Sequence, residues 1–143
     1  RGIAYSELNS GEKAIADYSR ALKLNPFHDA AFFKRGVVLA SLGRLMEAIE
    51  DYNRALYYGY DAADVYIERG LVYFILGQDD PAIEDFNRAI EIEPDEGSCY
   101  CFRGACYLLS GDKEQAAEDF HTARDLGYEE CEEFLERCGI IPD

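Results

Sequence analysis

The feature that most constrains the fold of this chain is an internal repeat with a period of 34 residues. Gly2, Gly36, Gly70 and Gly104 lie at this spacing, and an arginine precedes each of them. Further along each copy come the segments AIADYSRAL, AIEDYNRAL, AIEDFNRAI and AAEDFHTAR, again 34 residues apart. Helical patterns alone would drift out of register over such a length. The fixed period therefore indicates four copies of one structural unit, here called repeats 1 to 4.

Each repeat divides into two helical segments. Gly43, Gly77 and Gly111 are expected to close the first helix of their repeats, with the second helix beginning just beyond. Gly59 and Gly127 are expected to end second helices in a left-handed conformation. Small residues recur where the two helices would cross, and aromatic residues recur beside them. This arrangement lets two helix backbones approach closely while the rings fill the space on either side.

This pattern of small and aromatic positions resembles the tetratricopeptide repeat family, and the resemblance covers the whole chain. The matching positions are Gly2, Tyr5, Ala14, Tyr18 and Ala21; Gly36, Leu39, Ala48, Tyr52 and Ala55; Gly70, Tyr73, Ala82, Phe86 and Ala89; and Gly104, Tyr107, Ala116, Phe120 and Ala123. The resemblance implies an all-α fold, a right-handed superhelical α-solenoid of about four helix-turn-helix units with a C-terminal capping helix. In this register the repeats span residues 1–26, 27–60, 61–94 and 95–128, and the capping helix and tail span 129–143. Repeat 1 is then a helix pair whose first helix lacks its opening turns.

An arginine and an aspartate recur 16 residues apart in every repeat. The four pairs are Arg1 with Asp17, Arg35 with Asp51, Arg69 with Asp85, and Arg103 with Asp119. We expect a ladder of structural ion pairs between helices, in preference to a catalytic or ligand-binding role. Arg137 has no such aspartate and would have to reach back to Asp119. The spacing therefore leaves open whether the pairs form within repeats or between them.

The charge balance excludes some classes of partner. The chain has 29 acidic and 14 basic residues and a net charge of −15. Such a chain repels phosphate backbones and anionic lipid, so we expect no nucleic acid and no membrane surface as partner. No signal peptide and no apolar run of membrane-spanning length is visible. The chain has no initiator methionine, so we expect it to be a fragment that lacks its original N-terminus.

The five cysteines lie between residues 99 and 138 and form no CxxC pair. This pattern favours free thiols in a reducing compartment, with the cytoplasm as the default location. Packing of small residues in the core is the favoured role of the cysteines, and a metal or redox site is the alternative. Cys99 and Cys101 point to different sides of one helix, so we expect no metal site. His28 and His121 lie near no nucleophile or ligand motif, and we expect no catalytic residue and no cofactor.

The segment DVYIERGLVYFILG, residues 64–77, has apolar residues around almost its whole circumference. A helix of this kind is normally covered on every side. In the family that the chain resembles, first helices line the concave side of the superhelix, which implies that part of this segment faces a groove. The predicted groove residues are Phe33, Lys34, Val37, Ile67, Leu71, Phe74, Ile75, Cys101, Phe102, Leu108 and Leu109. The alternative is that curvature or neighbouring first helices cover many of them.

The favoured function is a non-catalytic scaffold or adaptor that binds a short helix or extended peptide of a partner protein through these apolar anchors. The surrounding carboxylates favour a neutral or basic peptide. We expect Phe74 and Phe102 to lie outside the core, so that alanine at either position leaves the helices intact. Lys34 is the only basic groove residue, which argues against the carboxylate clamp of co-chaperone members of the family. The alternative function is a structural or self-assembling segment, associating through the incomplete repeat 1.

Overall fold

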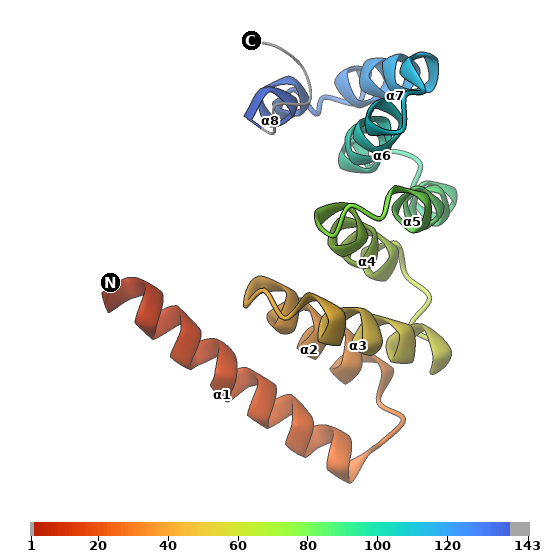
Figure 1. Ribbon diagram of the computed structural model, residues 1–143. Coiled ribbons are helices and arrows are strands. Elements are labelled where there is room, and N and C mark those ends of the chain that lie inside the picture. Colours follow the sequence, from red (N-terminus) through yellow and green to blue (C-terminus); the bar gives the residue numbers. More distant parts are fainter. Residues whose placement is uncertain (1, 138–143) are drawn as a thin grey trace. The chain divides into compact units, whose positions relative to one another are not determined.

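The computed structural model describes residues 2–137, and this part of the chain contains eight α-helices and no strand. The helices are α1 (Gly2–Leu24), α2 (Asp29–Ser41), α3 (Leu45–Tyr57), α4 (Ala63–Ile75), α5 (Asp79–Ile92), α6 (Gly97–Leu109), α7 (Lys113–Asp125) and α8 (Glu130–Arg137) (Figure 1). They form two compact units, unit 1 (Arg1–Asp61) and unit 2 (Ala62–Asp143). The all-α architecture predicted from the repeat is confirmed. The handedness of stacking along the whole chain stays a prediction.

The helix pairs are built by glycines in the left-handed region. Gly43, Gly77 and Gly111 have φ angles of 76°, 69° and 90°, and each lies between the first and second helix of its repeat. Gly59 and Gly127, which end second helices, have φ angles of 105° and 84°. Only glycine adopts this conformation without a steric cost from Cβ. The expected helix stops are therefore confirmed.

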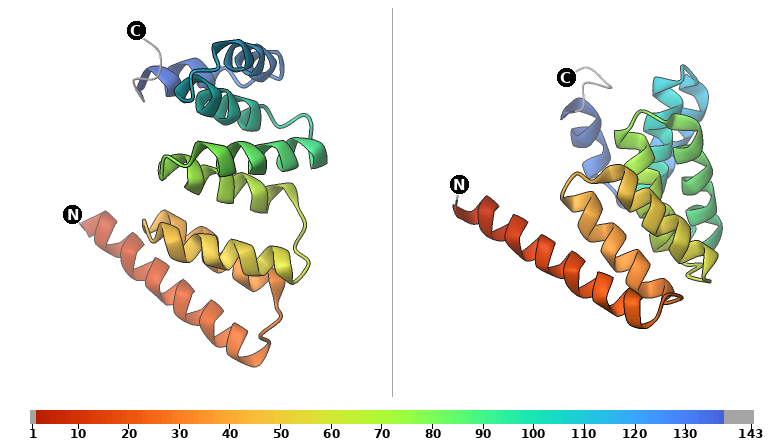
Figure 2. Two further views of the ribbon diagram at one scale, coloured as in Figure 1. Left: turned by 45° about the vertical axis from the view of Figure 1, so that its right-hand side comes forward. Right: turned by 60° about the horizontal axis from the view of Figure 1, so that its bottom comes forward.

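Repeat 1 is not a helix pair, and the expectation that residues 1–26 contain two helices is wrong. α1 runs without a break from Gly2 to Leu24, as the continuous red helix of Figure 2 shows. Asn9 stands where the other repeats have the glycine that closes the first helix. Asn9 lies inside the continuous helix, and in the described residues positive φ angles occur at glycines alone, so the backbone at Asn9 is right-handed. The helix continues through Ser10 and Gly11.

Close helix crossings occur at the repeated glycines. A Cβ atom added to Gly36 would lie 2.7 Å from a ring carbon of Tyr52, and one added to Gly104 would lie 2.7 Å from a ring carbon of Phe120. Real Cβ atoms do not approach other atoms so closely, so the ring occupies the space that a side chain would need. Tyr52 is fully buried by this contact with α2. The predicted role of the small and aromatic positions is thus confirmed at these two crossings.

In unit 1, α2 packs against both α1 and α3. In unit 2, each of the helices α4 to α7 packs against the next, α4 also contacts α6, and α8 lies against α6 and α7. Two clusters of buried side chains lie in unit 2. The first contains Ala63, Ala82, Phe86, Ala89, Cys99 and Cys106, and the second contains Cys101, Ala105, Ala123, Cys131 and Leu135. α8 contributes Cys131 and Leu135 to the second cluster and covers it, as predicted for the capping helix. Cys138 lies outside the described residues.

The expectation of free cysteines is wrong for two of them. Cys101 of α6 and Cys131 of α8 form a disulfide with a Cα–Cα distance of 5.7 Å. The spacing of 30 residues between them carries no motif, and only the packing of α8 on α6 brings them together. Cys99 and Cys106 are free and buried. The disulfide removes the argument from free thiols for a reducing cytoplasmic location.

Within residues 2–137, none of the helices combines the length and the hydropathy that crossing a lipid bilayer requires.

Candidate functional site

The recurring arginines and aspartates form two-pronged ion pairs within their repeats. Arg35 donates from Nε and Nη2 to the two carboxylate oxygens of Asp51, both at 2.7 Å. Arg69 donates to Asp85 at 2.8 and 2.6 Å, and Arg103 donates to Asp119 at 2.8 and 2.6 Å. Each pair joins the first helix of a repeat to the second. Of the remaining predicted pair, Asp17 is exposed on α1, and Arg1 lies outside the described residues.

Two of these arginines also reach back to the preceding repeat. Arg35 donates from Nη1 to Ser19 Oγ at 3.0 Å, and Arg103 donates from Nη1 to Asn87 Oδ1 at 2.6 Å. Both acceptors lie 16 residues before their arginine. Sequence reasoning missed them, although a signal existed. Ser19, Asn53 and Asn87 recur two positions after the aspartate of their repeats.

Burial and ring contacts hold the guanidinium groups in place. The Asp51, Asp85 and Asp119 carboxylates are buried, while the arginine side chains are only partly exposed. The Arg103 guanidinium carbon lies 5.4 Å from the centre of the Tyr100 ring. Burial raises the pKa of the Asp85 carboxyl, and the hydrogen bonds and charge of Arg69 oppose that shift. Each buried carboxylate has its matching cation, so the ladder is structural and offers no free charge to a ligand.

The candidate binding face of unit 2 is formed by the predicted groove residues on α4 and α6. Ile75 at the end of α4 is 66% exposed, and Leu109 at the end of α6 is 55% exposed. These two residues hold the same position in successive repeats, and their helices are in contact. Ile67, Leu71 and Leu108 are half-buried on the same two helices. Exposed aliphatic side chains at equivalent positions of two packed helices form an apolar surface that a partner side chain can cover.

Phe74 and Phe102 do not lie outside the core, and this part of the sequence-based prediction is wrong. The Phe102 ring stacks on the fully buried Phe86 ring with centroids 6.0 Å apart, and the Phe74 ring lies 5.9 Å from Phe102. Both rings are half-buried. Both rings pack against the core cluster of unit 2, and only part of each ring is accessible on the candidate face. Truncating either ring therefore also removes core packing.

Cys101 is not part of the exposed face. Its side chain is fully buried and bonded to Cys131, because α8 covers this side of α6. The neighbouring Ala105 is buried in the same cluster. A groove residue in the repeat pattern thus becomes a core residue where a further helix packs on it.

The predicted groove residues of unit 1 lie on α2. The Phe33 ring stacks on Tyr60 with centroids 4.8 Å apart and also lies 6.1 Å from the Tyr52 ring. Phe33 and Val37 are both half-buried, whereas Lys34 is exposed. Phe33 is therefore held by aromatic neighbours of its own unit.

Two acidic residues lie among the apolar residues of α4. Asp64 is exposed and Glu68 is half-buried. Burial raises the pKa of the Glu68 carboxyl, and the nearby Asp64 charge raises it further. Among the described residues, neither carboxylate takes part in a salt bridge with a basic side chain. The face of α4 therefore combines apolar side chains with negative charge that a cation can still neutralise.

A hollow of about 260 Å³ lies in unit 1 between α1, α2 and α3. The arginines that line it are Arg35, Arg44 and Arg54, and each already bonds to a carboxylate of Asp51, Glu47 and Glu50 respectively. Because these arginines already pair with carboxylates, the hollow offers few unpaired charged groups to a small ligand. The hollow is thus a weaker candidate than the apolar face of unit 2.

Comparison with known proteins identifies the repeat. Two family models described as tetratricopeptide repeat match residues 1–58 and 63–96. No curated protein sequence matches the chain. Among solved structures, the crystal structure of MamA superposes with a TM-score of 0.80 at 25% identity, covering 92% of this chain and 77% of MamA. MamA 41-end from Desulfovibrio magneticus RS-1 gives 0.77 at 26% identity, covering 89% and 72%. YrrB, described as a TPR protein with an unusual peptide-binding site, gives 0.77 at 26% identity, covering 85% and 62%.

Proposed function

We propose, because this chain belongs to the tetratricopeptide repeat family, that unit 2 binds a peptide or helix of a partner protein on the face formed by α4 and α6. The family is generally a non-catalytic fold for protein–protein interaction, and we propose a scaffold or adaptor role without enzymatic activity. The observation that carries the proposal is the exposure of Ile75 and Leu109 at equivalent positions of two contacting helices. The similarity to YrrB, a peptide-binding TPR protein, supports it.

The chemistry of the face favours a peptide that carries both an apolar and a basic residue. An aliphatic or aromatic side chain of the peptide would cover Ile75 and Leu109, removing apolar surface from water. A lysine or arginine further along the peptide would meet Glu68 or Asp64, which lie 7 and 11 residues before Ile75 on α4, about 10 and 16 Å away along the helix axis. The net charge of −15 adds a long-range attraction for a basic segment. Such an attraction mainly raises the association rate and loses strength in salt.

Substitution of the exposed anchors tests this proposal without disturbing the core. A peptide selected from a random display library on the immobilised chain serves as the probe, and its dissociation constant is measured by fluorescence anisotropy. Ile75→Ser and Leu109→Ser are each expected to weaken binding about tenfold, equivalent to about 1.4 kcal/mol. Circular dichroism should show the same helix content, because both side chains are largely exposed.

Leu126→Ser is the matched control, since Leu126 is an exposed leucine just beyond α7 in the same unit. It should leave the dissociation constant unchanged within about twofold. Equal losses in Leu126→Ser and in the two anchor variants would contradict the assignment of the face. Selection of acidic peptides in place of basic ones would contradict the charge preference.

Binding of a basic peptide should depend on pH through Glu68. The pKa of this carboxyl is raised from its ordinary value of 4.5, so it takes up a proton above pH 4.5 as the pH falls from 7. Protonation removes the negative charge that attracts the cation, and affinity should fall over this range. Glu68→Gln should bind more weakly at pH 7 and lose that part of the pH dependence. A wild-type affinity that rises as the pH falls would contradict the role of Glu68.

Self-association through unit 1 is the second candidate function. Leu24 at the end of α1 is 86% exposed, and Ala14, Tyr18 and Ala21 are only half-buried. In the described part of the chain α1 packs on α2 alone. A second copy could cover this flank. Multi-angle light scattering distinguishes self-association from peptide binding. A dimer in the wild type that becomes a monomer in Leu24→Ser would favour self-association, whereas a wild-type monomer favours peptide binding.

A further inference from the structure

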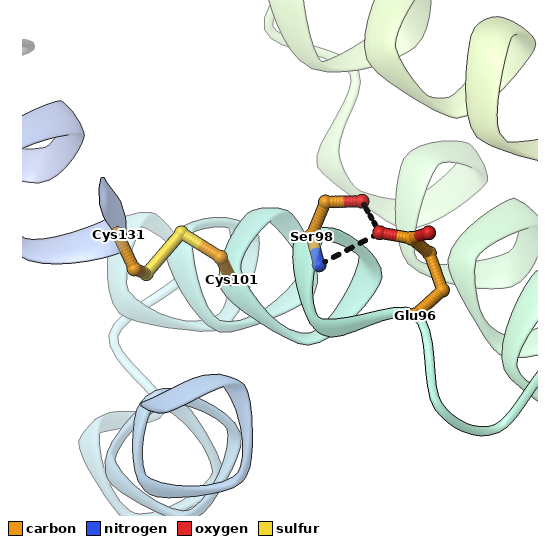
Figure 3. Close-up of a disulfide and its surroundings, with 4 residues drawn as sticks. All are labelled: Glu96, Ser98, Cys101 and Cys131. Carbon is orange, nitrogen blue, oxygen red and sulfur yellow. Dashed lines mark hydrogen bonds between the residues drawn. A yellow bond between two sulfur atoms is a disulfide. The ribbon is translucent and has the colours of Figure 1, made fainter. Parts of the chain in front are cut away.

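We propose that the disulfide between Cys101 and Cys131 is a redox-sensitive latch, which holds α8 on α6 and α7 and releases it when reduced. Figure 3 shows the bond joining α6 to α8, with the Glu96–Ser98 contact at the N-terminal end of α6, about one turn before Cys101. The bond connects residues 30 apart in sequence. The inference concerns the state of α8 and goes beyond peptide binding by unit 2.

α8 is a short helix that the disulfide ties to α6. The helix has eight residues, and among its side chains that the structure describes, Cys131 and Leu135 are buried, at 4% and 1% exposure. Glu130 and Glu133 are exposed. An isolated helix of this length does not persist in water, since nucleation is costly and few backbone bonds form. Once undocked, α8 therefore unfolds.

The surface beneath α8 is apolar and wholly covered while α8 is docked. Cys101, Ala105 and Ala123 are fully buried there, and the rings of Phe74, Tyr100 and Phe120 pack against the same cluster. Undocking would expose this cluster next to the Phe74 ring of α4. Unit 2 thus has two states. With the disulfide intact, α8 covers the apolar cluster, and after reduction the cluster is exposed to water.

The disulfide is a second attachment for a helix that otherwise follows α7 through a short turn. With the bond intact, the sulfur of Cys131 stays within bonding distance of α6, so α8 cannot leave as a whole. The remaining described thiols do not break it from within. Burial raises the pKa values of Cys99 and Cys106 to about 12, and a protonated thiol is a poor nucleophile. Among the described residues no thiol opens the bond, and we therefore assign the opening to a reductant from outside the chain.

A dithiol is the class of reductant that fits this site. Because both cysteines are buried, attack requires a local opening at α8. One thiolate of the dithiol then attacks Cys131 Sγ, and the S–S bond breaks with Cys101 leaving as thiolate. The second thiol of the reductant then attacks its own sulfur in the mixed disulfide and expels the Cys131 thiolate. Two electrons pass to the protein, two protons bind to the released thiolates, and the reductant becomes a cyclic disulfide. The reaction adds two free thiols, those of Cys101 and Cys131, to the free thiols of Cys99 and Cys106, and leaves α8 undocked.

Hydrogen exchange read by mass spectrometry tests the latch on the whole chain. After oxidation, alkylation under denaturing conditions should modify Cys99 and Cys106 and spare Cys101 and Cys131. After addition of dithiothreitol at the same pH, the amides of α8 should exchange about tenfold faster or more. The amides of α5 and α7 should change by less than about twofold.

Cys131→Ala keeps a small apolar side chain at this position and removes the bond. Without reductant it should exchange in α8 as the reduced wild type does, and dithiothreitol should have no further effect. Cys99→Ala is the matched control, because it alters a buried free cysteine of the same unit and should leave the response to dithiothreitol intact.

Three results would overturn the proposal. The first is alkylation of Cys101 and Cys131 in the oxidised protein. The second is equal protection of α8 in both redox states. The third is a loss of protection from hydrogen exchange in α6, α7 and α8 together, which would mean that the disulfide stabilises unit 2 as a whole. Should Cys131→Ala fail to fold, the comparison of oxidised and reduced wild type still decides.

Discussion

Asp85→Ala is expected to lower the free energy of unfolding by about 3–5 kcal/mol. The Asp85 carboxylate accepts two hydrogen bonds from Arg69 and is 4% exposed. Its removal leaves the Arg69 guanidinium partly buried between α4 and α5 without its counter-charge. The cost of that stranded cation exceeds the net contribution of the intact pair, which desolvation makes small. Urea denaturation followed by circular dichroism measures the change.

Asp17→Ala is the matched control, because Asp17 holds the same position in repeat 1 but is exposed on α1. It should change the free energy of unfolding by no more than about 0.5 kcal/mol. The double variant Arg69→Met with Asp85→Ala should be more stable than Asp85→Ala alone, since no unpaired charge remains. A loss below about 1 kcal/mol in Asp85→Ala, or equal losses at Asp17 and Asp85, would contradict the buried-pair account.

Phe86→Ala is expected to cost about 3–5 kcal/mol through the cavity that it leaves. The Phe86 side chain is fully buried in the first cluster of unit 2. Its ring lies against Gly70 at the crossing of α4 and α5, and Phe102 stacks on it from α6. Three helices thus lose a shared contact. Thermal and urea unfolding monitored by circular dichroism give the size of the effect.

Two further variants test whether the loss of stability follows the burial of the side chain that is removed. Phe102→Ala should destabilise the chain by less than Phe86→Ala, because its ring is half-buried. Ile75→Ala should change the free energy of unfolding by no more than about 0.5 kcal/mol, since its side chain is 66% exposed. If Phe102→Ala costs more than Phe86→Ala, the core of unit 2 is centred on the α4–α6 contact instead.

The repeat made most of the fold predictable, because each position was sampled several times. Gly36 and Gly104 recur with an aromatic residue at a fixed distance, and a chance pattern does not recur in register. The same repetition identified the arginine–aspartate pairs. A single occurrence of Arg35 and Asp51 would have been indistinguishable from two surface charges.

The failures fall where a residue departs from the repeat or where its exposure depends on a neighbour. Asn9 replaces a helix-closing glycine, and reasoning by analogy with the other repeats overlooked the replacement. Cys101 holds a groove position in the pattern, but α8, which follows the four repeats, covers it. Phe74 and Phe102 belong both to the candidate face and to the core. Sequence periodicity assigns a side of a helix but does not determine how much of a large ring remains exposed.

The arginine contacts impose a length rule on how such a chain can grow during evolution. Arg103 donates hydrogen bonds to a residue 16 positions ahead, Asp119, and to one 16 positions behind, Asn87. Duplication of a whole 34-residue block gives every new arginine both of its partners, and the flanking arginines keep theirs. An insertion of any other length inside one of these helices moves one partner to a different helix face. Lengthening by whole repeats is therefore tolerated, while small insertions are confined to the turns between helices.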